Sequence, residues 1–305
     1  MRIVMPLFDY ASTGIKSFSF GSFPFSIEPL KADEIIDTKL FSAQDINYMQ
    51  MESWCLVFNS AETQQYVEEL NLLIMAFRIS TQSRGPFIKY FLCKDDPLQC
   101  RRLNDPMFFY NYTSILTRKI FNQSDLEKVD SYFGRLIEMK SVSIRTKNAL
   151  YFTFRGMSST KWIDAFMMFM AALESLFSKD TSGGATKIIK ARVSSLLYTI
   201  NGTTEDDVGT LYDLRSKMTH GRIEVGDDPK ENLQSLAKLQ QLLHACLDIL
   251  LNKELYKHYA TKTMRDKFMD TLNNTARNNK GLNTDNNGIG NTERIISRDR
   301  INPSP

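Results

Sequence analysis

The chain has 305 residues, enough for one large domain or two of ordinary size. Hydrophobic residues make up 42% of it and charged residues 24%, a balance typical of globular proteins and unlike that of a disordered chain. The formal net charge is only +3, and residues 123–258 carry 18 basic and 17 acidic side chains. No segment has the basic excess of a general nucleic-acid binder, so any contact with nucleic acid must be local.

The cysteines and the apolar stretches indicate the compartment. The four cysteines form no C-x-x-C pair and have no histidines at zinc-finger spacing, so we expect free thiols in a reducing cytoplasm. The apolar run at the N-terminus is broken by Pro6 and Asp9 and is too short for a signal peptide. The most apolar stretch, 162–177, contains two carboxylates and is too short to cross a bilayer. We expect a cytoplasmic protein without a membrane segment.

Residues 1–122 have the pattern of a small mixed α/β region. The stretch SFSFGSFPFSI alternates aromatic and small residues, which favours a short strand or hairpin. Residues 53–59 and 87–93 are predicted strands, and residues 62–79 a helix with Tyr66, Leu70, Leu73 and Phe77 on one face. This region contains no catalytic pattern. A sensing, recruiting or packing role is open.

From residue 123 to about 260 the pattern is helical. Ser124 with Glu127 predicts a capping box that opens a helix to about Met139. Ser159 or Thr160 is expected to cap the third helix. Short loops between such helices favour antiparallel neighbours in a bundle. The expected helices cover 124–139, 145–157, 162–177, a segment after Gly183-Gly184, 208–220, and a long last helix opened by Asp228, Pro229 and Glu231.

The chain becomes rich in asparagine and glycine after about Leu272. Such a composition lacks the apolar surface that offsets the entropy of ordering, so we expect residues 273–305 to form a flexible tail. The fold expected from the whole sequence is therefore mainly α, with a helical bundle after a smaller α/β region.

The most informative stretch is VGTLYDLRSKMTHG, Val208–Gly221. A helix here places Val208, Leu211, Tyr212 and Arg215 on one stripe, and a cation on an apolar stripe needs a partner. Glycine is the preferred residue just past a helix end, so His220 is expected at the helix C-terminus, where the helix dipole favours a bound proton. An arginine can hold a phosphate and a histidine can move a proton, which together suggest cleavage of RNA.

Geometry constrains this pair. Residues five apart in a regular helix are separated by about 140° around its axis, so Arg215 and His220 do not converge on one small target. Either the helix tightens or ends before His220, or two copies of the motif line one cleft at a two-fold dimer interface. A purely structural interpretation stays open, with an ion-paired arginine and a helix-capping histidine.

Other polar residues complete the set of candidates. Glu174 lies inside the apolar edge of its predicted helix, and Arg215 is its natural partner, although a rim glutamate would show the same pattern. Lys187, Lys190 and Arg192 give the next helix a basic side that could meet RNA phosphates or simply face water. The chain lacks phosphate-binding, nucleophile-elbow and H-E-x-x-H motifs, so an enzyme here is expected to use no cofactor or metal.

Three segments resemble the HEPN superfamily, specifically the ApeA-like HEPN domains. They are KWIDAFMMFMAALESLF (Lys161–Phe177), KIIKARVSSLL (Lys187–Leu197) and LYDLRSKMTHG (Leu211–Gly221). Their order and spacing are far more specific than the spacing of one arginine and one histidine. The resemblance covers residues 124–258 and does not extend to the tail.

This resemblance implies an all-helical, HEPN-type domain at residues 123–260 that forms a homodimer. It implies a composite, metal-independent endoribonuclease site in which Arg215 and His220 take the places of the family's arginine and histidine, and Glu174 that of the acidic residue orienting them. Ser216 stands where many members have asparagine, aspartate or histidine, and is a candidate RNA contact. The resemblance further implies RNA, including tRNA, as substrate and a role as toxin or antiviral effector, with an antitoxin or a phage-derived trigger as partner. The alternative is a non-catalytic module for dimerisation or partner binding.

Overall fold

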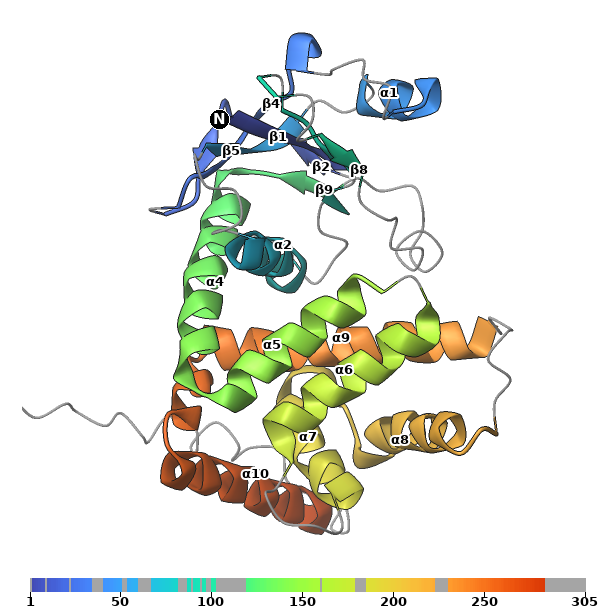
Figure 1. Cartoon of the computed structure of the whole chain (residues 1–305). Coiled ribbons are helices and arrows are strands. Elements are labelled where there is room, and N and C mark those ends of the chain that lie inside the picture. The colour runs from blue at the N-terminus through green and yellow to red at the C-terminus, as the bar shows by residue number, and fades with distance from the viewer. Residues whose placement is uncertain are drawn as a thin grey trace, which may run out of the picture.

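A computed structural model gives the fold of the chain. It describes residues 2–8, 10–21, 23–34, 41–50, 54–59, 67–81, 87–88, 90–93, 95–96, 100–102, 119–159, 161–178, 185–222 and 230–282. The described part is mainly helical, with a small antiparallel sheet near the N-terminus (Figure 1). The mainly α class expected from the sequence is therefore found.

The sheet has five strands in the order β3-β4-β5-β1-β6, and each neighbouring pair is antiparallel. Two smaller pairs accompany it, parallel β2–β9 and antiparallel β7–β8. The strands are β1 (Arg2–Phe8), β2 (Tyr10–Ser12), β3 (Phe18–Ser19), β4 (Phe25–Pro29), β5 (Trp54–Asn59), β6 (Phe87–Ile88), β7 (Tyr90–Phe91), β8 (Arg101–Arg102) and β9 (Lys119–Phe121).

The strand predictions are confirmed in outline. The aromatic stretch forms the β3–β4 hairpin, with Phe18 opposite Ile27, and residues 53–59 supply β5. The strand expected at 87–93 contains β6 and β7, with residue 89 outside the described residues, and Leu92 bridges to Val4. Short helical segments lie beside the sheet: η1 (Ala32–Glu34) and α1 (Ala43–Gln50).

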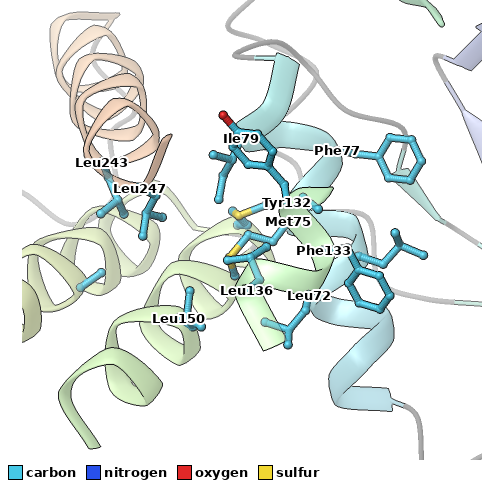
Figure 2. Packing of buried hydrophobic residues seen from close by; sticks show 14 of the residues in the cluster. Leu72, Met75, Phe77, Ile79, Tyr132, Phe133, Leu136, Leu150, Leu243 and Leu247 are labelled. Atoms are coloured by element: carbon cyan, nitrogen blue, oxygen red, sulfur yellow. The ribbon is translucent and has the colours of Figure 1, made fainter. Parts of the chain in front are cut away.

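Helix α2 (Val67–Thr81) lies between the sheet and the remaining helices (Figure 1). The sequence predicts one apolar face, but the helix is buried on nearly every side, and even Arg78 is only 5% exposed. The reason is that α2 has neighbours on both sides. Phe77 packs edge-on against Phe20 and Phe121 beneath the sheet, whereas Leu72 and Met75 point toward Leu136 of the next helix (Figure 2).

The other helices form a bundle below the sheet (Figure 1). Helices α5 and α6 pack closely along their length, α9 lies behind them, and α7 contacts both α8 and α10. Their bounds are α4 (Gln123–Val142), α5 (Ile144–Met157), α6 (Trp162–Phe177), α7 (Ala185–Asn201), α8 (Glu205–Thr219), α9 (Lys230–Asn252), η4 (Leu255–Tyr259) and α10 (Lys262–Leu282).

The helix boundaries correct two expected caps. Helix α4 begins after Asn122, whose side chain accepts from Asp125, so the capping box lies two residues before the predicted Ser124 and Glu127 pair. Helix α6 begins after Lys161, which makes no side-chain cap hydrogen bond. The bounds 162–177 expected for α6 are confirmed without the expected cap, whereas in α4 asparagine and serine are both favoured at the N-cap, so the sequence did not choose between Asn122 and Ser124. The expected cap at Asp228 and Pro229 lies outside the described residues.

The expected tail begins inside a helix. Helix α10 runs from Lys262 to Leu282, past the point where residues 273–305 were predicted to be flexible, and residues 283–305 lie outside the described part. Although α10 is polar overall, Met269 and Leu272 are buried and Phe268 packs against the core. This apolar stripe attaches the asparagine-rich segment to the bundle.

The state of the cysteines and the apolarity of the helices can be compared with the sequence-based expectations. All four cysteines, Cys55, Cys93, Cys100 and Cys246, are free and buried. Burial raises the pKa of the Cys55 thiol to about 12. Among the described residues, none of the helices combines the length and the apolarity needed to cross a membrane.

Candidate functional site

Helix α8 carries the arginine and the histidine, and both of its ends are capped. Thr204 and Asp207 form a reciprocal capping box at its start. At its end Gly221 adopts a positive φ of 64°, the Gly221 N–H donates to the Met218 carbonyl at 3.1 Å, and the Arg222 N–H to the Lys217 carbonyl at 2.8 Å. This is a complete Schellman motif, so the helix stop predicted from Gly221 is confirmed.

Glu174 of α6 and Arg215 of α8 form the predicted ion pair. Both guanidinium Nη atoms approach the two carboxylate oxygens at 3.3 Å, in a parallel, two-pronged geometry. The side chains are 30% and 36% exposed, so the pair lies at the surface of the bundle rather than in the core. The guanidinium is thus partly open to solvent, with both Nη atoms directed at Glu174.

Two further polar atoms lie in this cluster without a hydrogen-bond partner among the described residues. One is the Nε of Arg215 and the other is the hydroxyl of Tyr212, which lies one turn earlier on α8. Burial raises the pKa of Tyr212 well above its usual value, and the negative charge of Glu174 adds to this rise. The cluster thus holds an N–H and an O–H donor in addition to the ion pair.

His220 is exposed and stands apart from this cluster. Helix α8 ends at Thr219, and His220 is its C-cap residue, whose backbone N–H still donates to the Ser216 carbonyl at 3.0 Å, the regular i to i−4 bond. In the described residues no hydrogen bond or ion pair joins its imidazole to Arg215 or Glu174. The backbone bond to Ser216 keeps His220 in the register of the helix, where residues five apart are separated by about 140° around the axis.

Arg192 corrects a sequence-based expectation. It was a candidate RNA contact, but its side chain is only 1% exposed. Its guanidinium donates to the Phe177 carbonyl and, at 3.1 Å, to the Asn273 side chain of α10. The arginine holds three helices together and cannot meet a phosphate in solvent.

The remaining candidates stay near the surface. Lys187 is exposed on α7, and Ser216 is exposed beside Arg215. Lys190 lies across α8 instead of pointing outward, and its ammonium would be 2.6 Å from a Cβ placed on Gly209. That glycine gives the lysine room to lie against the helix that carries Arg215.

An open groove of about 530 Å³ borders the ion pair. It runs between α5 and α6, and Glu174 is one of its lining residues. The lining mixes aromatic, amide, hydroxyl and charged groups: Ile144, Arg145, Asn148, Phe152, Ala171, Glu174, Ser175 and Ser178. Glu174 therefore faces a groove on one side and Arg215 on the other.

The other two histidines are structural. His244 on α9 is buried, and burial together with the positive charge of Arg78 lowers its pKa to about 3. It stays neutral at physiological pH. The ring of His258 stacks on Phe268 at 5.1 Å between centroids.

Sequence reasoning missed Tyr212 and the groove residues Asn148 and Phe152 as parts of the candidate site. Tyr212 was assigned to the core because it fits the apolar stripe, and only its buried hydroxyl distinguishes it. Its position one turn before Arg215 was the available signal. Asn148 and Phe152 give no signal without the packing of α5 on α6.

No known protein family, curated protein or solved structure matches this chain. Among the described residues, no three His, Cys, Asp or Glu side chains are grouped so that they could hold a metal ion.

Proposed function

We propose that the chain is a HEPN-type endoribonuclease that cleaves RNA without a metal ion, at a site completed by a second copy. The observation that carries this proposal is the surface ion pair of Glu174 with Arg215 on the helix that ends at an exposed His220. The Arg215 side chain is 36% exposed although it pairs with Glu174, and His220 is exposed at the end of the same helix.

The proposed reaction is transesterification within RNA. The ribose 2′-OH attacks the adjacent phosphorus and the bond to the 5′ oxygen breaks, leaving a 2′,3′-cyclic phosphate and a 5′-OH. His220 transfers the proton, and Arg215 stabilises the charge that develops on the phosphate. Glu174 keeps the guanidinium oriented. DNA has no 2′-OH and should remain intact.

A two-fold dimer would bring the arginine and the histidine of the motif together at one site. Because five residues along α8 and its C-cap separate Arg215 from His220 by about 140° around the axis, we infer that a second α8 brings an arginine and a histidine to the same phosphate. We therefore propose a homodimer in the cytoplasm, acting as a toxin or antiviral effector. RNA, including tRNA, is the substrate, and an antitoxin or phage-derived trigger controls it.

Purified protein should be incubated with labelled RNA in EDTA beside His220→Ala and Arg215→Ala. We expect cleavage by the wild type and a loss of at least about a hundredfold in each variant, the usual range for removing an acid–base group or a charge-stabilising donor. His258→Ala is the matched control, since it removes a histidine that packs on Phe268. Cleavage that requires Mg²⁺, or that survives His220→Ala, would contradict the proposal.

One observation favours a second function, a non-catalytic module for dimerisation or partner binding. In the single chain Arg215 is already paired with Glu174, and His220 contacts neither of them. If the wild type and His220→Ala are equally harmless on induced expression, with and without phage challenge, this second function gains support.

A further inference from the structure

The groove between α5 and α6 and the face of α5 beside it have a composition suited to a single-stranded nucleic acid. Helix α5 carries three basic side chains and no acidic one: Arg145, Lys147 and Arg155. The groove contains one carboxylate, Glu174, and that carboxylate is neutralised by Arg215. The surface therefore presents no unbalanced negative charge to a phosphate backbone.

Aromatic rings and an amide lie on the same side of α5. Tyr151 is 58% exposed and packs edge-on against Phe152, with ring centroids 5.5 Å apart. Phe152 lines the groove, and so does the exposed Asn148. Bases stack on exposed rings whatever their sequence, and an amide can bond a base edge.

The three basic side chains of α5 have different surroundings. The Arg145 guanidinium donates to the Ser175 carbonyl at 3.1 Å and to the Ser178 hydroxyl at 3.0 Å, which fixes it in the wall of the groove. Lys147 faces α2, where its charge helps to lower the pKa of Glu68. Arg155 is exposed one turn after Tyr151. The groove side of α5 thus keeps two arginines next to its two rings.

We infer that this groove holds the RNA strand next to the cleaved phosphate, with bases stacked on Tyr151 and Phe152 and the backbone near Arg145 and Arg155. The inference rests on the proposed function, since it assigns a strand-binding subsite to the same reaction. Glu174 joins the two parts: it lines the groove and holds the arginine that grips the phosphate.

The test measures binding without cleavage. Fluorescence anisotropy with a labelled 2′-O-methyl RNA 12-mer uses a strand that cannot react by the proposed chemistry. Tyr151→Ala should weaken binding about tenfold, within the range for loss of one stacked base. Asn148→Glu should weaken it by a similar factor of about ten, because it places a negative charge in the groove.

Two matched controls separate the groove from the rest of the surface. Tyr198→Ala removes another exposed tyrosine, on α7, and Asn274→Glu adds the same charge on α10. Both should bind the 12-mer as the wild type does. The same strand annealed to its complement should bind more weakly, because paired bases cannot stack on protein rings.

Absence of binding, binding that does not depend on the groove, and loss of the dimer each overturn the inference. If the wild type does not bind the 12-mer, or if Tyr151→Ala and Asn148→Glu bind it like the wild type, the groove is not the subsite, whether or not RNA is cleaved. If those variants instead lose the dimer in light scattering, a second copy of the chain occupies the groove. Absence of RNA cleavage with retained, groove-dependent binding would reject only the catalytic proposal.

Discussion

Tyr212 and Tyr259 are both buried, but the described residues offer a hydrogen-bond partner only to the hydroxyl of Tyr259. The Tyr259 hydroxyl donates to the Leu176 carbonyl at 3.0 Å, whereas the Tyr212 hydroxyl has no partner among the described residues. A buried polar group without a partner costs free energy, and natural sequences keep few of them. Tyr212 is therefore a residue whose hydroxyl adds nothing to the stability of the isolated chain.

Replacing each tyrosine by phenylalanine tests this contrast. Tyr212→Phe should leave the free energy of unfolding unchanged or raise it by up to about 1 kcal/mol, because it removes an unpaired buried hydroxyl. Tyr259→Phe should lower it by about 1–2 kcal/mol, since it removes the buried hydrogen bond to the Leu176 carbonyl. Urea unfolding of both variants measures the difference. A clear destabilisation by Tyr212→Phe would mean that its hydroxyl has a partner in solution.

His244 makes the stability depend on pH. Its pKa is about 3 in the folded chain and about 6.5 when unfolded, so below pH 6.5 only the unfolded chain takes up this proton. The folded state therefore loses stability as the pH falls.

Between pH 7 and pH 5 this proton should lower the free energy of unfolding by about 2 kcal/mol. His244→Gln cannot take up the proton, so its stability should fall by that much less over the same range. Urea unfolding at the two pH values checks this. Equal slopes for the wild type and the variant would show that His244 is protonated in the folded chain.

At the scale of elements, two helical glycines permit close approach for different reasons. A Cβ on Gly156 of α5 would lie 2.5 Å from the buried ring of Phe169 on α6, which has no room to move. A Cβ on Gly209 of α8 would meet the end of the Lys190 side chain, which can swing toward solvent.

The two alanine substitutions should therefore change the free energy of unfolding in different ways. Gly156→Ala should destabilise the chain by about 1–3 kcal/mol, the usual cost of overpacking. Gly209→Ala should be neutral or stabilising by up to about 1 kcal/mol, because alanine is the better helix former. Thermal unfolding of both variants distinguishes them, and a large loss at Gly209 would show that Lys190 is fixed in place.

The helices and the ion pair were predictable from local pattern. The wide apolar face of α6 predicts that helix, and the glycine after His220 predicts where α8 ends. A charge on each of two apolar stripes predicts that Glu174 and Arg215 meet. The burial of Arg192 was not predictable, because its acceptor Asn273 lies 81 residues later in the chain. A lysine and arginine pattern on one helix cannot distinguish a solvated face from a buried one that a distant helix covers.

At the scale of the whole molecule, the described apolar core is continuous. Buried side chains of the sheet, of α2 and of the bundle belong to one cluster, with α2 in contact with both parts (Figure 2). The chain has two tryptophans, Trp54 in β5 and Trp162 in α6, so each part contains its own fluorescent reporter.

Trp54→Phe and Trp162→Phe leave one reporter each, in the bundle and in the sheet respectively. Because one core joins the two parts, urea unfolding should give coincident midpoints when each variant's fluorescence is compared with its own circular dichroism. A fluorescence midpoint that departs from the helical signal in the Trp162→Phe variant would indicate that the sheet unfolds by itself.

The contact between Arg192 and Asn273 also fixes an order of events during synthesis. The guanidinium on α7 is enclosed only when α10, far downstream, has left the ribosome and folded against it. Until then α7 carries a charge that belongs in the interior and has only the Phe177 carbonyl of its two acceptors. A growing chain that already contains Glu174, Arg215 and His220 is therefore unfinished, and its bundle becomes complete only when one of the last helices is added.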